Sequence, residues 1–202
     1  MKHFVVTVGC EYGSGGIEIG KMVAKSLGVE YYDRDLIDKV VEEIGVDRDL
    51  VKKADQGETV KYEFDTSFGP RYANLTNRVI YKQFEVINKF AEKSSCIIIG
   101  RCSNYILKDR DDCLNVFIYA PTEKRIQYVM EKKGLDHDKA AELVKYNDGM
   151  LSSRYNYMTG GDMRDCSMRD MMIDSSVLGL EKTAKYLSLI HISEPTRRVV
   201  IS

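Results

Sequence analysis

The 202-residue sequence contains no long hydrophobic run, no large excess of either charge and no paired cysteine motif. Because a helix that spans a bilayer needs about 20 apolar residues, the sequence predicts no membrane segment. A net charge of −1 gives no reason to expect duplex DNA or an anionic membrane as a partner. The short apolar run near the N-terminus ends in a glycine-rich turn and does not resemble a secretory signal.

Cysteines and histidines are few and scattered. The five cysteines are an odd number without a C-x-x-C pair, and the three histidines share no motif. A disulfide framework, a structural zinc site and a histidine-based metal or catalytic site are therefore not expected. We predict reduced thiols, mostly buried as small apolar side chains, in a cytoplasmic protein whose own side chains form no metal site.

Short apolar runs alternate with amphipathic stretches along most of the chain. Strands that are apolar throughout and alternate with helices indicate an α/β protein with a mostly parallel sheet covered on both faces. Ligands of such sheets bind beyond the carboxyl ends of the strands. Two stretches lack periodicity, 55–74, expected as a surface excursion, and 149–169. Strands are predicted at 3–9, 29–33, 95–100, 114–120 and 170–175, and helices at 17–28, 34–45, 47–54, 75–94, 101–110, 122–134, 136–148 and from 179 onward.

A glycine-rich turn, Glu11–Gly16, stands between the first predicted strand and the first predicted helix. Gly13, Gly15 and Gly16 allow the backbone to curl so that successive N–H groups point inward, and the following helix adds the positive end of its dipole. This geometry suits phosphate, and Ser14 offers a hydroxyl inside the loop. The alternative is a turn that is merely tight.

The turn departs from the usual phosphate-binding pattern G-x-x-x-x-G-K-[ST]. In alignment with that pattern, Cys10 stands at the first glycine, Gly16 at the lysine and Ile17 at the serine or threonine. The backbone donors remain, but the cation for the β- and γ-phosphates and the usual Mg²⁺-binding hydroxyl are absent. Lys21 lies more than one turn into the helix and is expected to point away.

Further candidates for anion binding follow the second and third predicted strands. Asp33 and Arg34 stand where a substrate phosphate or ribose could be met, although an aspartate helix cap with a solvated arginine fits equally well. Arg101 directly follows a buried strand, where a charge must face a cleft or a partner. Arginine at that place suits bidentate phosphate recognition.

A third group of cations lies in the segment 145–169. Phosphoryl transfer needs cations that close over the γ-phosphate, but a solvated loop has a similar composition. The candidate cations of this segment are Lys145, Arg154, Arg164 and Arg169.

In chain order, these segments resemble the cytidylate kinase-like proteins, a branch of the P-loop nucleoside monophosphate kinases. The resemblance covers residues 3–186 and rests on "EYGSGG", "YYDRDLI", "GRCSNYIL", "VFIYAPTEKRIQYV", "RYNYMTGGD" and "MMIDSSVLGLE". It implies a P-loop NTPase-like three-layer α/β sandwich with a five-stranded parallel sheet and a mobile lid over about 145–169. It also implies ATP with Mg²⁺ as the donor and a nucleotide such as CMP as the acceptor.

The resemblance assigns roles to the candidate residues and treats Gly16 in place of lysine as typical of the branch. Each missing donor costs a factor on the order of a hundred in rate, so the lid arginines are expected to compensate for the absent loop cation. Donor phosphates would be bound by Gly13, Ser14, Gly15 and Gly16, the acceptor by Asp33, Arg34 and Arg101, and the catalytic cations would be Arg154 and Arg164.

The sequence departs from the family pattern where that pattern usually carries cations. Cys10 and Ile17 replace arginines that flank the loop, and Leu151 stands where a D-x-x-R element beginning at Asp148 would have its arginine. The usual tryptophan and "NYD" near the end of the lid appear as Met163 and as the "MRD" of residues 168–170.

Three functions remain open at this point. The first is ATP-dependent phosphorylation of a nucleoside monophosphate, and the second is a non-catalytic nucleotide-binding regulatory module that kept the backbone cradle. The third is a kinase of the same fold with another small acceptor. The expected partner is a small-molecule nucleotide, with no nucleic acid and no membrane, and the oligomeric state is not predicted.

The C-terminal segment 187–202 is expected to lie outside the natural protein. Its first part, "LSLIHISEPTR", is the translation of a transposase-type sequencing adapter, and the reading frame of the adapter continues to the last two residues. We therefore assign the kinase-like domain to residues 1–186 and exclude 187–202 from functional reasoning.

Overall fold

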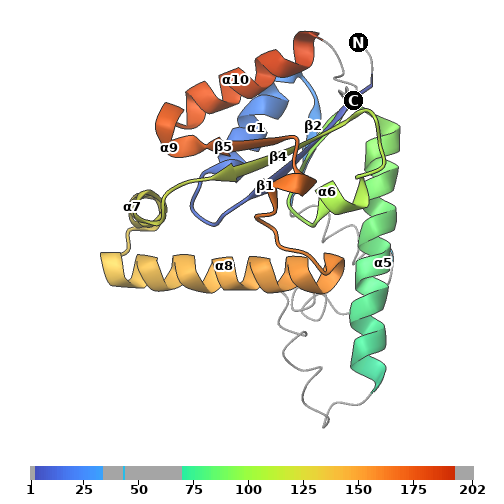
Figure 1. The fold of residues 1–202 in the computed structure, drawn as a ribbon, viewed down its shortest axis with the longest axis horizontal. Coiled ribbons are helices and arrows are strands. Elements are labelled where there is room, and N and C mark those ends of the chain that lie inside the picture. The colour runs from blue at the N-terminus through green and yellow to red at the C-terminus, as the bar shows by residue number, and fades with distance from the viewer. Residues whose placement is uncertain (1–2, 34–42, 44–69, 194–202) are drawn as a thin grey trace.

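Five parallel strands form the centre of the computed structural model, which describes residues 3–33, 43 and 70–193 (Figure 1). The strands are ordered β2-β3-β1-β4-β5. This sheet confirms the α/β fold class expected from the sequence, and all five strands overlap their predicted positions. Their bounds are β1 (Val5–Cys10), β2 (Glu30–Tyr32), β3 (Cys96–Ile99), β4 (Cys113–Tyr119) and β5 (Met171–Asp174).

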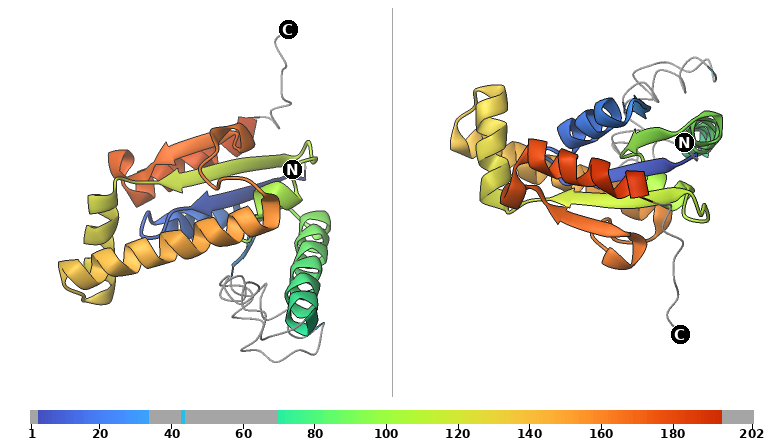
Figure 2. Two further views of the ribbon diagram at one scale, coloured as in Figure 1. Left: turned by 60° about the horizontal axis from the view of Figure 1, so that its bottom comes forward. Right: turned by 90° about the horizontal axis from the view of Figure 1, so that it is seen from above.

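Helices cover both faces of the sheet and complete the three layers. Figures 1 and 2 show α1 and α10 side by side over one face, and α5, α6 and the C-terminal part of α8 on the other. The helices are α1 (Gly16–Leu27), α5 (Pro70–Lys93), α6 (Ser103–Ile106), α7 (Thr122–Lys133), α8 (His137–Thr159), α9 (Ser175–Leu178) and α10 (Leu180–Ser193), with a 3₁₀ turn η1 at Cys166–Met168.

The alternation of side chains along the strands divides the core into two parts. Val6 and Val8 of β1 face α1 and α10, whereas Val5 faces α5, because successive strand residues point to opposite faces. Thr7 is fully buried on the α5 side, where its hydroxyl donates to Asn115 Oδ1 on β4 at 2.7 Å. The two faces of β1 therefore lie in different surroundings, one packed against α1 and α10 and the other against α5.

The helix α8 corrects the prediction that residues 149–169 lack regular structure. It continues through Gly149 to Thr159 and ends at Gly160, whose φ of 70° closes the helix in the left-handed region. A Cβ at Gly149 would contact nothing within 4 Å, so this glycine lies on an open side of the helix. In the C-terminal part of α8 the buried residues are Arg154 and Tyr155, so its buried face does not show the apolar periodicity from which a helix is predicted.

Two further predictions fall wholly or partly outside the residues that the structure describes. The helices predicted at 34–45 and 47–54 lie outside the described residues, except for residue 43, as does most of the excursion at 55–74. Its last residues belong to α5, which begins at Pro70, a favourable first residue of a helix because proline lacks the N–H that would be unpaired there. Within the described part of the chain, no helix has the length and apolar character needed to cross a membrane.

The last helix, α10, extends into the segment assigned to the sequencing adapter. Leu187 is buried against the α1 side of the sheet, and the helix ends at Ser193. Any leucine at this turn would pack in the same way, so the adapter origin of residues 187–202 stays a prediction.

Candidate phosphate-binding site

The turn between β1 and α1 requires glycine at two positions. Gly13 has φ 79° and Gly15 has φ 74°, in the left-handed region that residues with a Cβ rarely adopt. Space is also absent, since a Cβ at Gly13 would lie 2.9 Å from the Arg125 carbonyl oxygen and one at Gly15 would lie 2.3 Å from Leu180 Cδ2. The turn is therefore held tightly between α7 and α10.

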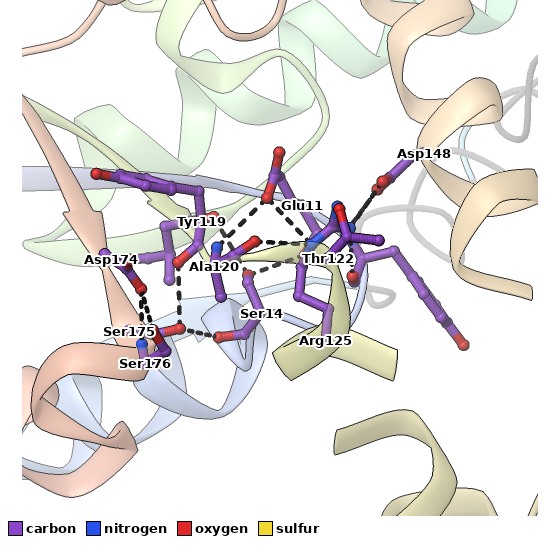
Figure 3. A network of polar contacts seen from close by, with 12 residues as sticks. Glu11, Ser14, Tyr119, Ala120, Thr122, Arg125, Asp148, Asp174, Ser175 and Ser176 are labelled. Carbon is purple, nitrogen blue, oxygen red and sulfur yellow. Dashed lines mark hydrogen bonds and ion pairs between the residues drawn. The ribbon is translucent and has the colours of Figure 1, made fainter. Parts of the chain in front are cut away.

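Carbonyl oxygens of the turn are bound by donors from the surrounding protein (Figure 3). The Glu11 carbonyl accepts the Ser14 N–H at 3.2 Å, the Tyr12 carbonyl accepts Arg125 Nη1 at 3.0 Å, and the Ser14 carbonyl accepts the Ser175 hydroxyl at 2.7 Å. In contrast, no side chain of the described residues caps the N-terminus of α1, and the first N–H groups of a helix have no acceptor inside it. These N–H groups and the helix dipole form a cradle suited to an anion.

Ser14 contributes to this cradle through its backbone. The side chain is buried, and its hydroxyl lies 2.9 Å from the Glu11 carbonyl oxygen and 3.2 Å from the Ile118 carbonyl oxygen, to either of which it can donate. The hydroxyl thus connects the turn to the end of β4.

The structure explains why the usual lysine is absent. A Cβ at Gly16 would lie 2.4 Å from Cys10 Cβ and 3.3 Å from Ile118 Cβ, so the start of α1 rests directly on β1 and β4. Burial, together with nearby carboxylates, raises the pKa of the Cys10 thiol to about 12, so this cysteine is a neutral packing group. The lysine position is closed by packing.

Two arginines reach the cradle through a network of carboxylates that the sequence analysis did not predict, and Figure 3 shows the part of it around Arg125, Glu11 and Asp148. Arg125, in the first turn of α7, is buried, with Nη1 2.7 Å from Asp148 Oδ2 and Nε 3.2 Å from Glu11 Oε2. Arg164 Nη2 lies 2.9 Å from Glu11 Oε1. Asp148 Oδ1 also accepts the Tyr12 N–H at 3.1 Å, which ties α8 to the turn.

The sequence offered only a weak signal for Arg125. It is the fourth residue of the helix predicted at 122–134, close to the carboxyl end of the strand predicted at 114–120, but it does not follow that strand directly as Arg101 follows its own. Nothing in the sequence pairs Arg125 with Glu11 or Asp148, since the three residues come from three elements that meet only in the folded chain.

The lid arginines predicted to be catalytic are placed differently from each other. Arg164 lies beside the phosphate cradle through Glu11. Arg154 is buried in α8, and its Nη2 donates to Gln83 Oε1 of α5 at 2.8 Å. This hydrogen bond connects α8 to α5. The structure therefore brings one of the two arginines to the cradle.

The predicted acceptor residues lie at the ends of β2 and β3. Asp33 follows β2 and is half-buried, while Arg34 lies outside the described residues. After β3, Gly100, Arg101 and Cys102 all have positive φ, at 72°, 59° and 53°. Left-handed backbone is unfavourable for a residue with a Cβ and is concentrated at functional sites, which makes the end of β3 a candidate for a second part of the site.

The described residues contain no group of three or more His, Cys, Asp or Glu side chains that could hold a metal ion. Mg²⁺ that arrives with a nucleotide needs only one or two protein oxygens in addition to phosphate oxygens and water. Glu11 and Asp148 border the cradle and fit that requirement, although both are ion-paired with arginine.

Comparison with known proteins gives matches over most of the chain. A family model described as the cytidylate kinase-like family matches residues 5–177. The cytidylate kinase of Methanopyrus kandleri is 23% identical, covering 91% of this chain and 90% of its own length. The cytidylate kinase of Thermoplasma volcanium is 28% identical, covering 64% of this chain and 69% of its own length.

Solved structures share the fold. An uncharacterized protein from Eubacterium ventriosum superposes with a TM-score of 0.72 at 23% identity, covering 95% of this chain and 99% of that one. A shikimate kinase from Bacteroides thetaiotaomicron has a TM-score of 0.55 at 12% identity, with coverage of 95% and 99%.

Proposed function

Because this chain belongs to the cytidylate kinase-like family, we propose that it transfers the terminal phosphoryl group of ATP to a nucleoside monophosphate, with CMP as the first candidate. The cradle Gly13–Gly16 holds the donor phosphates. Asp33, Arg34 and Arg101 bind the acceptor, and Arg164 is the lid cation at the reacting end. Arg154 is proposed as a lid cation that acts only if the lid rearranges.

The observation that carries this proposal is the contact between Arg164 and Glu11. Arg164 comes from the segment after α8, and its guanidinium lies 2.9 Å from a carboxylate of the phosphate turn. Cations that close over a transferring phosphoryl group are what this chemistry requires, because the group passes through a state with charge spread over its oxygens.

The protein's part in such a reaction is positioning and charge stabilisation. The backbone N–H groups at the start of α1 orient the donor phosphates, and the Arg125–Asp148 contact at 2.7 Å fixes α7 and α8 around the turn. Mg²⁺ bound with ATP supplies positive charge on the phosphates, and Glu11 and Asp148 are the residues that would hold it. Arg164 and the residues of the lid exclude water from the donor.

A second candidate, a regulatory nucleotide-binding module, is favoured by the same ion pairs. Arg125 and Arg164 both contact Glu11 and Asp148, at up to 3.8 Å, so two carboxylates balance the two cations beside the cradle. In this arrangement Arg164 remains on Glu11 when a nucleotide binds and does not reach the γ-phosphate.

A coupled assay with ATP, Mg²⁺ and a panel of nucleoside monophosphates tests the proposal. We expect turnover with CMP, and we expect Arg164→Met to lower kcat roughly a hundred-fold because one cation at the transferring group is lost. Turnover restricted to another small acceptor would replace the acceptor assignment. ATP binding without turnover on any acceptor would favour the regulatory module.

A further inference from the structure

Arg169 lies at the carboxyl edge of the sheet, on the face opposite α1, where its guanidinium packs on two aromatic rings. Its guanidinium carbon is 5.1 Å from the centroid of Phe117 on β4 and 5.5 Å from that of Tyr155 on α8. A Cβ on Gly9, the residue before Cys10, would lie 3.5 Å from Arg169 Nη2. The absence of a side chain at Gly9 leaves room for this guanidinium directly before the phosphate turn.

Part of the hydrogen-bonding capacity of this guanidinium is unused among the described residues. Nη2 donates to the Met163 carbonyl at 3.0 Å, while Nε and Nη1 are enclosed and have no acceptor in the described part of the chain. A buried donor without an acceptor costs about 1–3 kcal/mol, and more when the donor is charged. Such a group marks a place where an acceptor is supplied from outside the protein.

No carboxylate of the described residues forms a close ion pair with Arg169. Desolvation lowers the pKa of the Arg169 guanidinium, and the carboxylate that counteracts this is that of Asp165. The Asp165 carboxylate accepts the Ser167 N–H at 2.8 Å, where it caps the turn η1. Arg125 and Arg164, in contrast, each have a carboxylate within 3 Å.

We propose that Arg169 binds the phosphate group of the acceptor through its unpaired guanidinium N–H groups. The donor cradle opens at the N-terminus of α1, whereas Arg169 lies over Gly9 on the other face, near Cys102, the neighbour of Arg101. An acceptor phosphate between the end of β3 and the turn would meet an unpaired N–H of this guanidinium, whose positive charge suits a phosphate. The stacked rings hold the guanidinium plane in place.

This assignment deepens the proposed kinase function and rests on it for the identity of the acceptor. It differs from a structural role, in which the stacked arginine only stabilises α8 against β4. A structural role predicts that loss of the guanidinium lowers the melting temperature and affects both substrates alike. Phosphate binding predicts a selective effect on the acceptor.

Steady-state kinetics of Arg169→Met and Arg169→Lys test the assignment. We expect Arg169→Met to raise the KM for CMP about 10- to 100-fold, as befits lost hydrogen bonds to a charged group, and to change the KM for ATP less than about threefold. Arg169→Lys keeps the positive charge but loses the geometry of the guanidinium. Its KM for CMP should therefore lie between those of the parent protein and of Arg169→Met. Arg110→Met, at the opposite edge of the sheet, is the matched control and should leave both KM values unchanged. Equal changes in both KM values for Arg169→Met would overturn the assignment.

A second measurement decides the assignment without turnover. The ¹⁵N–¹H signal of Arg169 Nε, identified by its absence from the Arg169→Lys spectrum, should move when inorganic phosphate is added to the full chain at constant ionic strength. A signal that does not move would overturn phosphate binding at Arg169. If the signal moves and no acceptor is phosphorylated, the proposed kinase function fails while the anion site stands.

Discussion

Replacing Gly16 with lysine, the residue that phosphate-binding loops usually carry there, is expected to destabilise the protein and not to improve catalysis. A Cβ at this position would lie 2.4 Å from Cys10 Cβ and 3.0 Å from its sulfur, at the junction of α1 with β1. Because overpacking of a dense core costs typically about 1–3 kcal/mol, Gly16→Ala and Gly16→Lys should both lower the free energy of unfolding by that amount. Urea denaturation measures the change, and the coupled kinase assay shows whether activity rises.

The matched control and a rescue variant separate this packing effect from a general effect of removing glycine. Gly149 is a helical glycine with nothing within 4 Å of its Cβ position, so Gly149→Ala should be neutral or stabilising by up to about 1 kcal/mol. Cys10→Gly combined with Gly16→Ala removes the clash and should recover stability relative to Gly16→Ala alone. A Gly16→Lys variant as stable as the parent and more active would contradict this account of the closed lysine position.

Replacing Arg125 with methionine is expected to have the largest effect on stability of any single charge removal discussed. Arg125 is 3% exposed and contacts Glu11 and Asp148 through Nε and Nη1, at 3.2 and 2.7 Å. Removing one partner of a buried pair leaves a buried charge uncompensated, at a cost of roughly 3–5 kcal/mol. Nη1 also donates to the Tyr12 carbonyl at 3.0 Å, so the turn loses a support and nucleotide affinity should fall with stability.

An exposed pair of the same residue types provides the comparison. Arg110 and Asp112 form two contacts, at 2.7 and 2.8 Å, but their side chains are 26% and 29% exposed. Arg110→Met should therefore lower the unfolding free energy by no more than about 1 kcal/mol. Similar losses for Arg110→Met and Arg125→Met in the same denaturation experiment would show that burial does not govern the Arg125 pair.

Local signals in the sequence were sufficient for most of the fold. The helices predicted at 17–28 and 122–134 do end at glycine: Gly28 follows α1 and Gly134 follows α7, both in the left-handed region. Strands of continuous apolar residues predicted a parallel sheet because both of its faces are buried. Residues 149–159 of α8 were missed because their buried positions, Arg154 and Tyr155, do not form an apolar periodicity.

The candidate site was predictable only where its signal is local. Gly13 and Gly15 could be predicted from a strand–turn–helix pattern, because left-handed backbone between those elements requires glycine. The partners of the turn could not be predicted, since Arg125 and Asp148 reach it from helices far along the chain. Charges that meet through tertiary structure leave no pattern in the order of the residues.

The central claim is that a cradle of backbone N–H groups binds nucleotide phosphate without the usual lysine. Calorimetric titration of the full chain with ATP and with adenosine, each with Mg²⁺, tests this claim directly. We expect ATP to bind at least about tenfold more tightly than adenosine, a difference of about 1.4 kcal/mol from the phosphates. Gly13→Ala, whose Cβ would lie 2.9 Å from the Arg125 carbonyl oxygen, should remove that preference. Equal affinities for ATP and adenosine in the parent protein, or an undiminished preference in Gly13→Ala, would contradict the claim.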